Sequence, residues 1–291
     1  MRRFVRTAAP IPVAVFFGST TGCSFGPPEN LRGPTREVGQ VYHTEMKLTM
    51  TDGTITVMAG GGVSESGRID ITSRGEYEDE VRAVTGGRVT GLRTRFLAEQ
   101  DTQTVRLGGQ TDARTEDSPL AGETVDADLT DGAWKNRLVG KAPTDRQAAD
   151  LATLPPPQSS ADWYPDGKVR RGHAWEVDAR QLSRLFGTGL RIDAGSWRLT
   201  FEKAVTVDGA RCARIAEAID VTGRMRDDRG ESVAFSLEVT GTSLRSLEGG
   251  FDLSTCLTGT MTMTGTVSEG GRESEVTIRG PVAVESKTRR K

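Results

Sequence analysis

The chain has 291 residues, and its 38 Lys and Arg against 40 Asp and Glu give a formal net charge of −2. This balance lacks the basic footprint that phosphate neutralisation requires, which argues against nucleic acid as a partner. Glycines number 35 and aromatic residues are 5%, and Thr is abundant. Such a composition favours turns and β-branched strands over helical bundles, so we expect a mainly β protein of one large domain or two ordinary ones.

The first 22 residues have the pattern of a secretory signal peptide. Three arginines within the first six residues precede an uncharged apolar stretch, residues 8–18. This stretch is shorter than the roughly 20 apolar residues that a membrane-spanning helix needs. Residues 23–40 are polar and rich in Gly and Pro, as a flexible tether is. We therefore expect residues 1–22 to be removed on export and residues 23–40 to be a tether.

The end of this signal segment resembles a known sorting signal. The run Thr20-Thr21-Gly22-Cys23 resembles the lipobox of bacterial lipoproteins, in which a small residue precedes a Cys that is acylated and becomes the mature N-terminus. Thr20 departs from the pattern, which usually has Leu there. The resemblance implies lipidation of Cys23 and a protein of the cell envelope held to the membrane by a lipid anchor only. The alternative is a plain secretory signal, with Cys23 incidental.

The N-terminal half, residues 41–140, alternates apolar and polar side chains, which is the period of a half-buried strand. The alternation is clearest just before Asp52-Gly53, a pair that favours a type I′ turn. We predict a hairpin there and a second turn at Asp131-Gly132. Weaker strands are predicted at residues 69–71, 81–84, 89–97, 105–107 and 125–129.

The C-terminal half, residues 195–291, shows the same alternation more strongly and predicts six or seven strands, with a turn at Asp208-Gly209. Closely spaced strands joined by short turns indicate antiparallel meander sheets with one face buried and a face of Thr, Arg and Glu in water. The pattern leaves open whether the halves are two β-rich units or one curved half-barrel sheet.

Between the halves, residues 141–194 change to a helical period and form a connector. Thr144 with Gln147, and Asp178 with Gln181, are spaced as capping boxes at the starts of two short helices. We therefore predict two short helices between the two β-rich halves.

Several features together resemble secreted bacterial lipoproteins. They are the opening strand at residues 39–42, the long Thr-rich strands, the central helical pair and the phrase GHAWEV at residues 172–177. These look like members of uncharacterised secreted bacterial lipoprotein families. The layout is also similar to half-barrel lipoprotein carriers of the LolA type, in which a curved antiparallel sheet wraps around helices. The resemblance implies binding of an apolar ligand, or other envelope work, without catalysis.

The sequence offers no motif for an enzyme, a cofactor or a metal. His43 lies on the polar phase of its strand, and we expect it to be solvated or paired across strands, while no nucleophile motif accompanies either histidine. Asp126, Asp128 and Asp131 miss the spacing of a calcium loop, so we interpret them as a strand that ends in a turn. The acidic residues 76–80 are interpreted as a solvated cluster beside a turn.

Three of the few aromatic residues, Trp163, Tyr164 and Trp175, gather around one turn of the connector. Large aromatics bury the most surface per residue, so we favour an interpretation in which they pack the connector onto the sheet. If exposed beside Asp162 and Asp166, they would instead form a stacking platform for a sugar ring.

Cys212 and Cys256 are the thiols that remain once Cys23 is set aside. Export places them in a compartment that permits disulfides. Both are out of phase with the apolar residues of their strands, so both should face away from the core. We predict a disulfide between them if their strands are neighbours; otherwise they are two unrelated thiols.

The apolar phase of the C-terminal half is rich in large or adaptable side chains, and the helices have little apolar surface to cover it. The candidate ligand face consists of Phe235, Leu237, Phe251, Leu253, Met261 and Met263. We predict a non-enzymatic envelope lipoprotein that binds an apolar or lipid-like ligand on this face. The alternative is a structural or protein-interaction lipoprotein with a solid core, no small ligand and other envelope proteins as partners.

Overall fold

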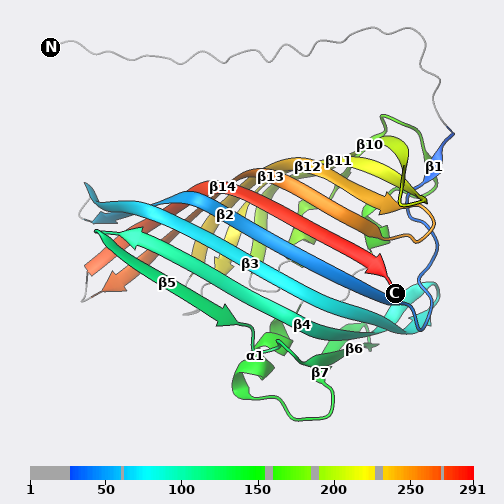
Figure 1. Ribbon diagram of the computed structural model, residues 1–291, viewed down its shortest axis with the longest axis horizontal. Helices are drawn as coiled ribbons and strands as arrows, with labels where there is room; N and C mark the ends of the chain where they lie inside the picture. The colour runs from blue at the N-terminus through cyan, green and yellow to red at the C-terminus, as the bar shows by residue number, and fades with distance from the viewer. Residues whose placement is uncertain (1–26, 60–61, 155–159, 185–189, 227–231, 270–271) are drawn as a thin grey trace, which may run out of the picture.

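The alternating strands assemble into one antiparallel sheet rather than separate ones. The computed structural model describes residues 27–59, 62–154, 160–184, 190–226, 232–269 and 272–291, so the predicted signal segment 1–22 and Cys23 lie outside the described residues. Within these ranges, twelve strands form a sheet of order β7-β6-β4-β3-β2-β14-β13-β12-β11-β10-β9, with β5 paired to β4. The prediction of a mainly β, antiparallel fold with few helices is confirmed (Figure 1).

Many strands are longer than the sequence pattern suggested. The sheet strands are β2 (Val41–Ala59), β3 (Gly62–Thr85), β4 (Arg88–Leu107), β5 (Gln110–Asp117), β6 (Thr124–Thr130), β7 (Ala133–Leu138), β9 (Ala174–Val177), β10 (Leu190–Val207), β11 (Ala210–Arg226), β12 (Ser232–Ser246), β13 (Asp252–Glu269) and β14 (Arg272–Arg290). The strands predicted at 69–71 and 81–84 are both part of β3, and those at 89–97 and 105–107 are both part of β4. The C-terminal half likewise has five long strands instead of six or seven.

The two halves of the chain meet through β2 and β14. These strands pair antiparallel from Tyr42 opposite Arg290 to Met58 opposite Glu275. Every other strand pair of the C-terminal half follows chain order. The strands of both halves therefore belong to one continuous sheet, whose edge strands among the described residues are β9 on one side and β5 and β7 on the other.

Residues directly opposite each other on neighbouring strands share a face of the sheet. Apolar residues of neighbouring strands are opposite one another, so the sheet has one apolar and one polar face. In β13, Met261 and Met263 lie on the apolar face, whereas Thr260 and Thr262 lie on the other. The sheet is curved, as Figure 1 shows, and the buried residues of the connector pack against its apolar face. A single hydrophobic cluster accordingly runs from β2 and β3 to β10 and β11. We call this apolar side the concave face and the opposite side the convex face.

The hairpin predicted at Asp52-Gly53 is wrong, because β2 continues through it. Asp52 has a positive φ of 55°, but the register shift at Gly53 is a bulge. β14 has a register shift at the same level. There, a Cβ added to Gly280 would lie 2.7 Å from the Cα of Gly53. The two glycines thus let neighbouring backbones approach closely where both strands are irregular.

The other two Asp-Gly pairs form the predicted turns. Asp131 and Gly132 join β6 to β7, and Asp208 and Gly209 join β10 to β11. All four residues have positive φ, as a type I′ turn requires.

The connector contains one of the two α-helices predicted. The helix α1 (Asp145–Thr153) starts at Thr144 with the predicted capping box. The second predicted helix is instead the 3₁₀ helix η2 (Ala179–Arg184), and a further 3₁₀ turn is η1 (Ser160–Trp163). The backbone amide of Gln181 donates to the carbonyl of Asp178 at 2.8 Å, which is an i to i+3 bond typical of 3₁₀ geometry.

The segment predicted as a tether is part of the fold from Glu29 onward. Strand β1 (Glu29–Asn30) pairs with β8 (Lys168–Val169) of the connector. The next residue, Leu31, is fully buried. Only the first residues of the 23–40 segment can therefore serve as a free tether.

A fully buried arginine holds this N-terminal segment against the sheet. The guanidinium of Arg245 donates to the carbonyl oxygens of Leu31 and Arg32 and forms an ion pair with Asp252 at 3.0 Å. It also lies 4.0 Å above the ring centre of Tyr164. One side chain of β12 thus joins the N-terminal segment, the connector and the start of β13.

Gly280→Ala should destabilise the protein, because the added methyl group would meet the backbone of Gly53. We expect a loss of about 1–3 kcal/mol in the free energy of unfolding, measured by urea denaturation. Gly62→Ala is the matched control, since a Cβ there meets no atom within 4 Å. Equal stability of the two variants would contradict the close packing of the bulges.

Arg245→Leu should cost about 3–5 kcal/mol, because it leaves Asp252 and the backbone carbonyls of Leu31, Arg32 and Gly250 without their buried partner. Arg214→Leu, which removes an exposed ion pair with Glu202, should cost less than about 1 kcal/mol. Limited proteolysis should also detect release of residues 29–33 in the Arg245 variant alone. An intact N-terminal segment in that variant would refute its anchoring role.

Candidate functional site

Four residues of the predicted ligand face lie together on the concave face of β12 and β13. Phe235 is directly opposite Met263, and Leu237 is directly opposite Met261. Phe235 is buried, whereas the other three are only partly buried and pack against the main core. The two methionines are therefore not enclosed by protein atoms.

The other two predicted residues belong to a different cluster. Phe251 and Leu253 lie at the start of β13 and pack with Tyr42, Val81 and Leu92. The rings of Tyr42 and Phe251 meet edge to face with 5.1 Å between their centres. The six-residue ligand face is thus corrected to a four-residue group plus a separate buried cluster.

Sequence reasoning missed residues from the N-terminal half and from β14 that extend this group. The partly buried apolar side chains on the same face are Ile71, Val105, Leu107, Val276, Ile278 and Val284. Ile278 connects the two halves, because it is opposite Met263 on one side and Ile55 on the other. Their alternation was visible in the sequence, but their proximity depends on the pairing of β2 with β14. We call the partly buried apolar residues of this face, including Leu237, Met261 and Met263, the apolar floor.

The described helices cover the concave face only toward its two edges. Near the β9 edge, η2 contacts β10, and Trp163 packs on Trp197 with 5.0 Å between ring centres. Near the β7 edge, α1 contacts β7 and places Leu151 against Phe96. On the central strand β2 between these covers, the concave side chain of Met46 is 38% exposed.

The aromatic residues of the connector pack inward, as the favoured interpretation held. Tyr164 is buried and donates to Asp252 at 2.8 Å, and the indole of Trp175 donates to the carbonyl of Trp163. His173 stacks on Trp175 with 5.9 Å between ring centres. A pocket of about 320 Å³ remains beside them, but these contacts occupy the rings on which a sugar would stack.

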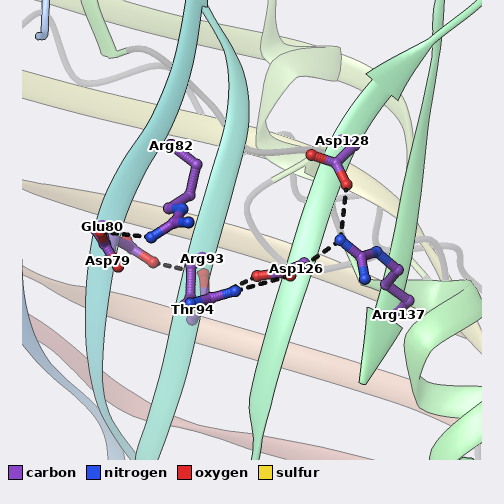
Figure 2. A network of polar contacts seen from close by, with 8 residues as sticks. All are labelled: Asp79, Glu80, Arg82, Arg93, Thr94, Asp126, Asp128 and Arg137. Carbon is purple, nitrogen blue, oxygen red and sulfur yellow. Dashed lines mark hydrogen bonds and ion pairs between the residues drawn. The ribbon is translucent and has the colours of Figure 1, made fainter. Parts of the chain in front are cut away.

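The part of the concave face nearest β4 is polar and acidic. Asp79 and Tyr77 of β3 share this face with Glu99 and Asp101 of β4, since Gly75 is opposite Glu99 and Ser73 is opposite Asp101. Asp79 accepts a hydrogen bond of 2.6 Å from the hydroxyl of Thr94 (Figure 2). We call Glu99 and Asp101 the acidic flank; Asp79 is opposite Thr94 and lies farther along the two strands, beyond Tyr77 and Phe96.

The surrounding protein shifts the pKa values of Asp79 and Glu99. Burial raises the pKa of Asp79 above its ordinary value. Burial also raises the pKa of Glu99, and the nearby charges of Asp101 and Asp150 raise it further. The acidic residues predicted as a loop cluster at 76–80 instead lie within β3, where alternation places Asp79 on the concave face and its neighbours on the convex face.

The convex face of the same strands is neutralised by ion pairs. Figure 2 shows Asp126 between Arg93, at 2.7 Å, and Arg137, at 3.1 Å, with Asp128 3.5 Å from Arg137. Arg93 first, and Arg137 to a smaller extent, lower the pKa of Asp126. The interpretation of these aspartates as a strand that ends in a turn is confirmed. No cluster of three or more His, Cys, Asp or Glu in the described ranges is arranged to hold a metal ion.

His43 lies on the polar phase as predicted, but it is buried instead of solvated. Its side chain is 5% exposed, and its Nε2 lies 3.4 Å from carboxylate oxygens of both Glu45 and Glu76. Glu78 approaches Nδ1 at 3.7 Å. The long charged side chains of the convex face thus enclose the ring.

The predicted disulfide is absent, since Cys212 and Cys256 are both free thiols. Cys212 is opposite Ser246 of β12, whereas Cys256 is opposite Thr242 of the same strand. Two strand spacings and four residues of offset separate the thiols by roughly 16 Å, well beyond the roughly 7 Å that a disulfide allows between Cα atoms. Cys256 is exposed, but Cys212 is buried, contrary to the prediction that both face away from the core.

Comparison with known proteins gives no relative to guide the assignment. No protein-family model matches the chain, and no curated protein matches it in sequence. None of the described helices combines the length and apolar character needed to cross a bilayer.

A buried carboxyl in the core of the concave face provides a pH test of the fold. Glu217 is 8% exposed and accepts a hydrogen bond from the indole of Trp197 at 3.2 Å. Burial raises its pKa above the ordinary value of 4.5. Below pH 4.5 both folded and unfolded chains hold the proton, so burial of this carboxyl carries no penalty for ionisation there. As the pH rises above 4.5, only the unfolded chain ionises readily, so folding stability falls until the folded-state pKa is reached.

Glu217→Gln should therefore become stabilising relative to the native protein as the pH rises from 4 to 7. The amide keeps an oxygen for Trp197 and cannot ionise. Urea denaturation of both proteins at pH 4, 5.5 and 7 measures the difference. A difference that stays constant with pH would show that Glu217 does not titrate abnormally.

Proposed function

We propose that the protein is a non-enzymatic lipoprotein of the bacterial cell envelope that binds an apolar or lipid-like ligand on its concave face. The observation that carries the proposal is the apolar floor, which spans both halves of the sheet and is only partly buried. Soluble proteins seldom leave contiguous apolar surface of this kind without a use.

The floor suits a flexible apolar chain. Leu237, Met261 and Ile278 lie on three neighbouring strands, and strands are about 4.8 Å apart. Methionine adapts its shape to irregular partners. At about 25 cal/mol per Å², a ligand chain that removes about 200 Å² of apolar surface from water would gain about 5 kcal/mol.

Export and a lipid anchor at Cys23 are part of this proposal and rest on the lipobox resemblance. Cys23 precedes Glu29, the first residue of β1, by six residues. Six extended residues span at most about 20 Å. An anchor at Cys23 would therefore hold the end of the molecule that contains β1 close to the membrane.

The alternative, a lipoprotein that contacts another envelope protein, is favoured by a different surface. Val63, at the start of β3, is 67% exposed, and Met58, at the end of β2, is 37% exposed. Val267 near the end of β13 is 41% exposed. These residues lie beside the β2–β3 and β13–β14 connections, at the same end of the sheet, where a protein partner could bury them.

Leu237→Glu should weaken binding of the apolar fluorescent probe N-phenyl-1-naphthylamine at least tenfold, because it places a charge on the apolar floor. Thr262→Glu is the matched control on the convex face of the adjacent strand and should bind as the native protein does. Probe titration measures both, with circular dichroism to verify folding. A second variant, Met263→Trp, should reduce binding by filling the floor without charge.

Failure of the native protein to bind the probe would contradict the proposal. Equal binding by the native protein and by both floor variants would also contradict it, because the probe would then occupy another site.

A further inference from the structure

We propose that the occupant of the concave face is a cationic amphiphile, whose apolar tail lies on the apolar floor and whose positive group lies against the acidic flank. This inference rests on the proposed function, because it names the chemical class of the ligand for the same face. It is carried by the arrangement of charge across β2, β3 and β4.

The apolar floor and the acidic flank are joined by a strip of small residues. On β2, Met46 and Leu48 are opposite Gly75 and Ser73 of β3, and these in turn are opposite Glu99 and Asp101 of β4. The apolar and acidic side chains are therefore two strand spacings, about 10 Å, apart. A Cβ added to Gly75 would meet only ring atoms of Tyr77, at 3.7 Å or more. An amphiphile can cross this strip without displacing a large side chain.

The carboxylates of the acidic flank differ from those of the convex face in their ion-pair partners. On the convex face, Asp126 and Glu80 each form an ion pair with an arginine (Figure 2). Within the described residues, the ion pairs of the protein include none to Glu99 or Asp101. The concave positions of β3, which are its odd-numbered residues, contain neither Lys nor Arg. The flank thus has no ion-pair partner among the described residues; Arg114 of β5 shares its face but pairs with Glu116.

This charge selects among amphiphiles. A phosphate or carboxylate head group would meet like charges on the flank, whereas an ammonium or guanidinium group would be attracted. The raised pKa of Glu99 agrees, because burial and the nearby carboxylates of Asp101 and Asp150 disfavour its charged form, which a cation would stabilise. Glu99 is partly buried and Asp101 is exposed, so a head group can reach them.

The test compares three ligands that share a ten-carbon tail: decyltrimethylammonium and decyl phosphate, each below its micelle concentration, and decanol below its solubility limit. Isothermal titration calorimetry of the native protein should give at least tenfold tighter binding of the cation than of the phosphate. The preference should shrink at 1 M salt, because ions screen the flank. Decanol reports binding to the floor alone.

The double variant Glu99→Gln, Asp101→Asn should abolish the preference for the cation while leaving the affinity for decanol within twofold of the native value. The matched control is Glu80→Gln on the convex face of β3, which should keep the full preference. Decanol binding also verifies that each variant is folded.

If decanol binds but the two charged ligands bind equally, the inference of a cationic ligand is overturned and the proposed function stands. A preference that survives in the Glu99 and Asp101 variant overturns it as well, because the flank would not be its source. If none of the three ligands binds the native protein, the proposed function itself fails.

Discussion

The pairing of β2 with β14 is the constraint on which the rest of the structure depends. It joins residues near the two ends of the described chain along almost the full length of both strands. Without it, the N-terminal and C-terminal strands would form two smaller sheets, each with an additional exposed edge. The paired glycines 53 and 280 allow the two strands to stay together through their bulges. Because this contact is so distant in sequence, its formation should limit the folding rate.

Once the two halves share a sheet, strand alternation divides their side chains between two environments. The convex face receives the Thr residues and a set of Arg and carboxylate pairs that neutralise one another, as around Asp126. The concave face receives the apolar side chains of β12, β13, β14 and β2, and at β4 it receives acids without an arginine among their ion partners. The curvature of the sheet then turns these side chains toward a common interior. A concave surface with an apolar part and an acidic part follows from alternation and curvature together.

The N-terminal segment ties this surface to the membrane end of the proposed lipoprotein. Arg245 joins Leu31 and Arg32 to Asp252 and lies on the ring of Tyr164, so a buried charge is compensated by an ion pair and by backbone carbonyls. Such a charge is costly to leave unpaired, which makes the docked position of residues 29–33 well determined. The same contacts hold Tyr164 of the connector against β12, while η2 contacts β10, so the described helices leave the central strands of the concave face uncovered.

The sequence by itself determined the local features of this protein. Alternation predicted the antiparallel strands, the pair Thr144 and Gln147 predicted α1, and two Asp-Gly pairs predicted their turns, because each depends on residues close together in the chain. Four of the six candidate ligand residues were also placed on one face, since neighbouring strands share phase. The tertiary structure alone decided that Asp52-Gly53 is a bulge, that Phe251 and Leu253 pack in a separate cluster with Tyr42, and that Cys212 and Cys256 are too far apart to bond. It also brought β14 beside β2 and gathered Glu99 and Asp101 on the concave face. Strand register and long-range strand pairing set these outcomes. Both depend on packing between segments that are far apart in the chain, and no local sequence pattern specifies which segments pair.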